Sequence, residues 1–157
     1  MRASILAVSI FALAVNLVAA EKAKPHEAGD PIRIINGKRV DFTEAIRLHA
    51  VIKSRVASNA DPAVKAAAEK RKAEARRLFR PWENMLVEGR IEDTARPEGL
   101  MIAKEIPGGE LVAVKNAPAH LRDGAVSIFA GPIGTTRYGS KTIKLFDYGT
   151  PVPPASK

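Results

Sequence analysis

Apolar residues recur at helical spacing along residues 41–56 of the chain. The positions that share this face are Phe42, Ala45, Ile46, His49, Ile52 and Val56. Apolar residues three to four positions apart predict an amphipathic helix with one side packed against the rest of the protein. Asp41 and Glu44 match a capping box at its start, and the pattern predicts that the helix ends near residues 58–59.

A second helix is predicted over residues 62–80. Asp61 precedes Pro62, so the carboxylate can cap the helix while proline takes the first position without losing a hydrogen bond. The segment that follows is rich in Ala, Lys, Arg and Glu, which favour helix strongly. Because only a short link joins the two helices, residues 41–80 are expected to form an antiparallel helical hairpin.

From residue 84 the apolar positions alternate with polar ones, which is the period of a half-buried strand. Four strands are expected in the stretches NMLVEGRIE, GLMIAKEI, ELVAVKN and AVSIF. The stretch GTTRYGSKTIKLFDYG, residues 134–149, adds two more strands around a turn at Gly139-Ser140. Six short strands within residues 82–149 predict a sheet that closes on itself and hides its edges.

The turn at Gly139-Ser140 also predicts the two faces of the last hairpin. In this register Tyr138, Ile143 and Leu145 point into the core, and the cations of both strands point to solvent. Phe146 falls on the outer face, where we expect it to lie beneath the helices. The hairpin is therefore interpreted as part of the sheet's packing and not as a binding surface.

The two ends of the chain are expected to lie outside the folded part. Residues 1–20 place one arginine before an apolar run and end in small residues, the pattern of a secretory signal peptide cleaved before Glu21. The alternative is an uncleaved anchor, although the run is interrupted by polar residues and short for a membrane span. Residues 21–40 are expected to be a flexible leader with a short extended segment, which Asn36-Gly37 could alternatively fold into a small hairpin, and residues 150–157 a disordered tail.

An exported location, periplasmic or extracellular, follows from this signal. No later segment of the sequence is apolar enough to span a membrane. The chain contains no cysteine, which excludes disulfides, thiol catalysis, thiolate metal ligands and a lipid-modified cysteine. Stability must therefore come from packing.

The formal net charge is +8 at pH 7, and most of the excess lies in one segment. Residues 62–80 hold seven Lys and Arg against two Glu, whereas residues 83–149 hold eight cations against nine carboxylates. The candidate polyanion-binding residues are Lys65, Lys70, Lys72, Arg76, Arg77 and Arg80. Such a helix is suited to salt-sensitive, sequence-independent binding of nucleic acid or an anionic surface. Alternatively, these cations are ordinary solvated positions or partners of acidic residues on the sheet.

No motif in the sequence predicts catalysis. His49 lies on the apolar face of the first helix, where a packed and satisfied histidine is expected. His120, Asp123 and Ser127 include the residue types of a catalytic triad, but Asp123 is explained by a turn and Ser127 lies within a strand. Phosphate-binding and metal-binding motifs are absent, so neither a cofactor nor a metal is expected. A small enzyme or inhibitor would need a cleft between the helices and the sheet.

The stretches VEGRIEDTARPEGLMIAKE, LVAVKNAP and LRDGAVSIFAGPIGTTRYGSKTIKLFDYG resemble the barrel of a loosely defined group of uncharacterised exported bacterial proteins. The matching positions are Gly89, Arg90, Asp123, Gly124, Gly134 and Tyr138. The resemblance implies an exported protein with a helical segment before a small barrel similar to the OB fold. It implies no activity, because the group has no assigned function.

The expected fold class is therefore α+β, with an N-terminal antiparallel helical hairpin followed by a small, mostly antiparallel five- to six-strand OB-like β-barrel. The expected function is that of a non-catalytic exported structural or interaction module of the cell envelope. Its partner would be an envelope protein or a second copy of the chain, since the weak apolar stripe of the second helix also fits a dimer seam. The alternative function is polyanion binding through the basic second helix.

Overall fold

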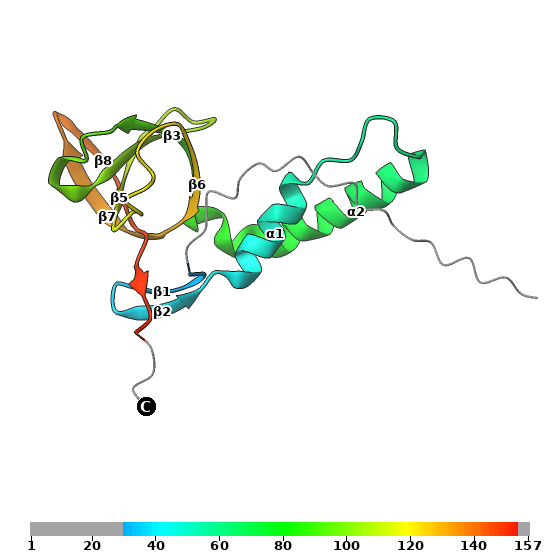
Figure 1. Ribbon diagram of the computed structural model, residues 1–157, viewed down its shortest axis with the longest axis horizontal. Helices are drawn as coiled ribbons and strands as arrows, with labels where there is room; N and C mark the ends of the chain where they lie inside the picture. Colours follow the sequence, from blue (N-terminus) through cyan, green and yellow to red (C-terminus); the bar gives the residue numbers. More distant parts are fainter. Residues whose placement is uncertain (1–29, 154–157) are drawn as a thin grey trace, which may run out of the picture.

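The computed structural model describes residues 30–153 (Figure 1). The first part contains strands β1 (Ile32–Ile35) and β2 (Lys38–Asp41), helices α1 (Thr43–Lys53) and α2 (Pro62–Phe79), and the 3-10 helix Arg80–Met85. The second part contains β3 (Leu86–Asp93), the 3-10 turn Pro97–Gly99, β4 (Met101–Glu105), β5 (Leu111–Lys115), β6 (Ala125–Phe129), β7 (Gly131–Tyr138), β8 (Lys141–Asp147) and β9 (Thr150–Pro151). The predicted signal peptide, the first part of the predicted leader and residues 154–157 lie outside the described range.

The strands form two sheets. A six-stranded sheet has the order β6-β3-β4-β5-β8-β7, and a three-stranded sheet has the order β2-β1-β9. Neighbouring strands are antiparallel except for β5 and β8, which are parallel. In Figure 1 the six-stranded sheet occupies one end of the molecule, and α1 and α2 lie side by side at the other end. The β1–β2 hairpin lies below the junction of the two parts in that view.

The predicted OB-like closed barrel is wrong, because both sheets are open. β6 and β7 are the edge strands of the six-stranded sheet, and in the described residues each pairs with one neighbour. Ala130 alone separates these strands in sequence, so the chain passes from one edge to the other and the sheet curls without a ladder between its edges. A curled open sheet and a barrel show the same alternation of residues, which is why the sequence pattern could not distinguish them.

Parts of the predicted leader and tail meet in the three-stranded sheet. β1 and β2 form a hairpin around Asn36 and Gly37, whose φ angles of 48° and 74° are those that a two-residue turn of this kind requires. β9 pairs with the other side of β1 through Thr150 and Pro151. The residues after β8 that were expected to be disordered therefore begin with a short strand.

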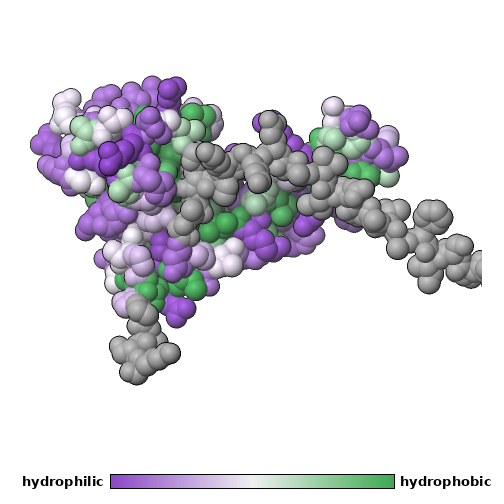
Figure 2. Space-filling model, viewed as in Figure 1, coloured by the Kyte–Doolittle hydropathy of each residue, from purple (hydrophilic) through white to green (hydrophobic). Residues whose placement is uncertain are grey.

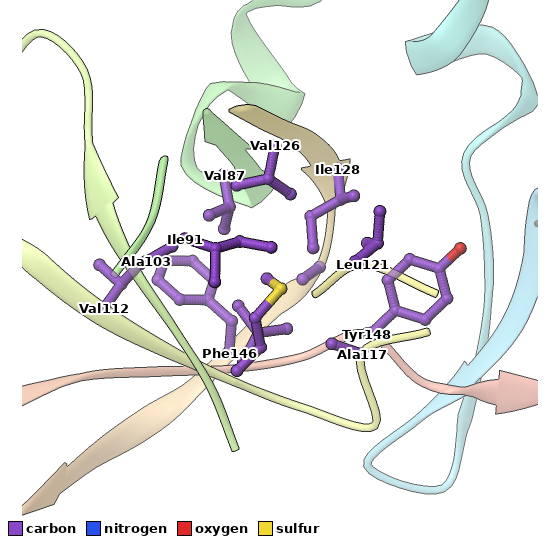
Figure 3. Packing of buried hydrophobic residues seen from close by; sticks show 13 residues of the cluster. Val87, Ile91, Ala103, Val112, Ala117, Leu121, Val126, Ile128, Phe146 and Tyr148 are labelled. Atoms are coloured by element: carbon purple, nitrogen blue, oxygen red, sulfur yellow. The ribbon is translucent and has the colours of Figure 1, made fainter. Parts of the chain in front are cut away.

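The main hydrophobic core lies inside the curl of the six-stranded sheet (Figure 3). Its members are Val87, Ile91, Met101, Ala103, Val112, Val114, Ala117, Leu121, Val126, Ile128, Ala130, Phe146 and Tyr148. Figure 3 shows the labelled side chains gathered toward one another between the strands and the connecting loops. This cluster buries alternate residues of β3, β4, β5 and β6, as the period-two pattern predicts, together with Phe146 of β8.

The register of the last hairpin is confirmed, but one of its faces is not the predicted one. Tyr138 pairs with Lys141 and Arg137 with Thr142, as expected for a turn at Gly139-Ser140. Phe146 is 6% exposed and belongs to the main core, so its predicted place on the outer face is wrong.

The face of β8 that includes Ile143 and Leu145 packs instead against Ile102 and Ala113 in a smaller cluster on the other side of the sheet. Because both sides of this sheet carry apolar residues, alternation alone could not show which one faces the main core. The predicted place of Ile143 and Leu145 in the main core is therefore wrong.

Helix α1 is shorter than predicted and lacks the capping box. The carboxylate of Asp41 accepts a hydrogen bond from the backbone N–H of Thr43 at 2.9 Å, which satisfies one donor of the first turn. Glu44 does not return to the start of the helix, because its carboxylate pairs with Arg47 at 2.6 Å. The helix ends at Lys53 and not near residues 58–59.

The start of α2 confirms the predicted cap. The carboxylate of Asp61 accepts a hydrogen bond from the N–H of Ala63 at 2.7 Å, and Pro62 takes the first helical position. The loop 54–61 connects the two helices and includes the residues predicted to be the last turn of α1.

A second core joins the helices to both sheets. Its buried members are Ile35, Phe42, Ala45, Leu48, Ala75, Phe79 and Phe129. Phe129, at the end of β6, lies 5.6 Å from the ring of Phe42 and 5.9 Å from that of Phe79. The guanidinium of Arg33, a residue only 2% exposed, lies 4.6 Å from the Phe42 ring and 3.8 Å from the Tyr148 ring. This stacking connects β1, the start of α1 and the end of the six-stranded sheet.

Candidate functional site

Helix α2 carries five of the six predicted polyanion-binding residues on the sides that α1 leaves uncovered, and the sixth, Arg80, is the C-cap residue that follows it. The helix packs against the second core through Ala75 and Phe79. At 3.6 residues per turn, the six candidate cations cover about 160° of the helix surface. This arc begins at Lys72 beside the packed side and reaches the opposite side at Lys70 and Arg77. The candidates therefore form one continuous cationic surface, in which Glu69 is the only acidic position.

Few of the cations of this segment are neutralised. Lys72 Nζ lies 3.1 Å from Glu69 and Arg77 Nη2 lies 3.6 Å from Glu74, and both carboxylates are more than half exposed. Ion pairs of this kind contribute little to stability. The cations that form no ion pair with any residue of 30–153 are Lys65, Lys70, Arg71, Arg76 and Arg80. Lys65 instead donates a hydrogen bond to the carbonyl oxygen of Ser58.

The alternative that these cations pair with acidic residues on the sheet finds no support in the described part of the chain. The ion pairs between a helix and the six-stranded sheet come from α1, through His49 and Lys53. In Figure 1 α2 extends away from the sheet, and its first residues and the loop 54–61 lie farthest from it. Figure 2 shows hydrophilic and hydrophobic residues side by side at this far end.

A polar cluster that no pattern in the sequence predicts surrounds Glu88 of β3. The Glu88 carboxylate lies 3.0 Å from Lys53 Nζ and 3.3 Å from His49 Nε2, and it accepts a hydrogen bond from Ser127 Oγ at 3.3 Å. A small pocket of about 220 Å³ lies beside Glu88 and also contains Glu105. The four clustered side chains come from α1, β3 and β6, so no local motif could have predicted their meeting.

This cluster does not have the geometry of a hydrolase triad. In such a triad the imidazole stands between the serine and the carboxylate, so that it can remove the proton of the serine hydroxyl. Here the Glu88 carboxylate stands between Ser127 and His49. His120 and Asp123, the other members of the triad considered from the sequence, are exposed in the loop between β5 and β6. The structure therefore does not support the activation of Ser127 by a histidine.

His49 is packed as the sequence predicts. Its ring stacks on Phe79 at 5.7 Å and meets Phe129 edge-on at 5.9 Å. Burial lowers the pKa of His49 from its ordinary value, and the nearby Glu88 carboxylate opposes this shift. The Nε2 atom has no hydrogen bond among the described residues despite its closeness to Glu88, so the expected satisfied histidine is packed but not fully satisfied.

Within residues 30–153 no three His, Asp or Glu side chains are grouped in a way that could hold a metal ion. None of the helices described there has the length and apolar character needed to cross a membrane. Comparisons with protein-family models, with curated proteins and with solved structures gave no match to this chain. The resemblance to exported bacterial proteins therefore stays a prediction from the sequence.

Proposed function

We propose that this protein is a non-catalytic, exported interaction module of the cell envelope that binds polyanions through α2. The observation that supports the proposal is the uncompensated charge of this helix. Residues 62–80 hold seven cations and two carboxylates, and five of the cations form no ion pair within residues 30–153. The pattern of residues 1–20 supports the exported location.

The arrangement favours binding to a charged backbone over recognition of a particular sequence. A helix holds its cations in fixed relative positions, so a polyanion can contact several of them at once and release its counterions. The described cations of α2 are not interleaved with exposed aromatic residues, which would be needed to stack bases. Binding should therefore depend strongly on salt and weakly on sequence.

The proposal is tested by measuring the affinity of the purified protein for fluorescent duplex DNA and for heparin at increasing salt. In the variant R76Q/R77Q/R80Q we expect weaker binding, and a salt slope for duplex DNA reduced by about 0.9 for each lost contact. The matched control R90Q/K104Q/K115Q removes the same charge from exposed positions of the six-stranded sheet. Equal losses in the two variants would show that binding follows net charge and would contradict a site on α2.

A second candidate function, self-association through α2, is favoured by two exposed apolar side chains. Val64 is 51% exposed and Leu78 is 43% exposed. They are fourteen residues apart in sequence and lie on the same side of the helix, as residues of a coiled-coil seam do. Sedimentation equilibrium tests this function: a dimer that becomes monomeric in V64S/L78S would establish it, and a monomeric parent protein would exclude it at the concentrations used.

A further inference from the structure

A groove lies between the loop 54–61 and residues 65–72 of α2. It has a volume of about 430 Å³ and is lined by Arg55, Val56, Ala57 and Ser58 from the loop and by Lys65, Glu69 and Lys72 from the helix. It is located at the far end of the helices, where Figure 2 shows hydrophobic and hydrophilic residues together. Neither the hydrophobic pattern nor any motif predicted it, because residues 54–58 were expected to continue α1.

We propose that this groove binds a phosphate group. Its three cations and one carboxylate give a formal charge of +2, which matches a phosphate dianion. Arg55 forms no ion pair with any residue of 30–153, so its guanidinium is available for a bidentate contact. The phosphate site deepens the proposed function. It rests on that function in one respect, because both assign anion binding to α2.

Two lysines are held at the groove by contacts that a phosphate would complement. Lys65 Nζ donates to the carbonyl oxygen of Ser58 at 2.5 Å, which fixes the ammonium against the loop. The Lys72 side chain is only 14% exposed, whereas its partner Glu69 is 63% exposed. A lysine with a largely covered side chain has few positions open to its ammonium, so the charge is already held at the groove before a phosphate binds.

The apolar part of the groove indicates what is attached to the phosphate. Val56 and Ala57 line the wall beside the cations, so carbon atoms next to the phosphate would contact apolar side chains. Two sources share this chemistry, namely a soluble phosphate ester and the headgroup of an anionic phospholipid. The phosphate group is common to both, and the vesicle experiment below distinguishes them.

The test uses the purified protein, inorganic phosphate and backbone amide shifts in two-dimensional NMR. We expect phosphate to shift the amides of residues 55–58, 65 and 72, and K65Q/K72Q to weaken binding about tenfold for each lost charged contact. The matched control R90Q/K144Q removes the same charge and also one pair with a glutamate, but both residues lie on the six-stranded sheet and neither lines the groove. It should bind phosphate within about twofold of the parent protein.

Equal weakening in both double variants, or shifts spread over the outer surface of α2, would overturn the groove site. Heparin retention without phosphate binding would also overturn the groove site, but it would leave the proposed function intact. Conversely, groove binding without heparin retention would support the site and contradict the proposed function. Co-sedimentation with vesicles of equal parts phosphatidylglycerol and phosphatidylcholine, lost in K65Q/K72Q but kept in R90Q/K144Q, would identify a lipid headgroup. Phosphate binding without co-sedimentation would identify a soluble phosphate ester.

Discussion

Gly89 lies where the backbone of β4 approaches the backbone of β3 closely. It is buried in β3 and pairs with Glu105 of β4 on one side and Val126 of β6 on the other. A Cβ atom added to Gly89 would lie 2.2 Å from the carbonyl oxygen of Lys104 and 2.8 Å from its carbonyl carbon. Since both atoms belong to the backbone, no side-chain rotation can relieve the contact, and Gly89→Ala must push β4 away from β3.

The expected cost follows from the distance that the strands must move. For the new Cβ atom to make an ordinary contact, β3 and β4 would have to move apart by about 1 Å. This movement would stretch the hydrogen bonds between the two strands beyond their normal range of about 2.7–3.2 Å. Overpacking that only displaces side chains costs about 1–3 kcal/mol. Because a central ladder must open here, we expect Gly89→Ala to lower the free energy of unfolding by about 3 kcal/mol or more. For a domain of this size that corresponds to a fall in Tm of about 10 °C.

Urea and thermal unfolding followed by circular dichroism measure this effect, with Gly108→Ala as the control. Gly108 lies in the turn between β4 and β5, and an added Cβ there would meet no atom within 4 Å. The free energy of unfolding of the control should lie within about 1 kcal/mol of that of the parent protein. If Gly89→Ala has the same urea midpoint and slope as Gly108→Ala, the close approach of β3 and β4 is refuted.

Three further changes test other parts of the structure by urea unfolding. Burial lowers the pKa of His49, so the imidazole binds a proton more readily in the unfolded chain than in the folded protein. The free energy of unfolding should therefore fall as the pH drops from about 7.5 to about 5. His49→Gln should flatten this pH dependence. An unchanged pH dependence in His49→Gln would contradict that assignment. Phe42→Ala removes a fully buried ring that contacts Phe129 and Arg33, so it should lower the free energy of unfolding by about 3–5 kcal/mol. A decrease below about 1 kcal/mol would contradict the packing of the second core. Asp61→Ala removes the cap of α2 and should cost about 1 kcal/mol, whereas no loss would show that the cap is not needed.

The features that could be predicted from the sequence are those decided by neighbouring residues. Asp61 and Pro62 start α2 because a cap and a fixed φ act within one turn. Gly139, with a φ of 59°, lies in the turn that sets the register of the last hairpin. Asn36 and Gly37 likewise form a turn that their own conformational preferences favour.

The features that could not be predicted depend on residues far apart in sequence. Phe146 and Ile143 are both apolar and lie on opposite faces of β8, so only the packing of β3 to β6 decides which face becomes the main core. Closure of the sheet would require β6 and β7 to pair, and these two strands remain at opposite edges of the sheet. The Glu88 cluster is a similar case, since Ser127 is 39 positions away along the chain.

The cationic surface is different, because its residues could be identified from composition alone. Helix α2 packs through few buried side chains, chiefly Ala75 and Phe79, and its solvent-facing positions are therefore free to carry charge without affecting the core. Substituting Arg76, Arg77 and Arg80 should accordingly change the free energy of unfolding by less than about 0.5 kcal/mol for each residue. A loss of polyanion binding in that variant can then be attributed to the lost contacts and not to unfolding. The separation of charge and packing on α2 is what makes its proposed role testable independently of the fold.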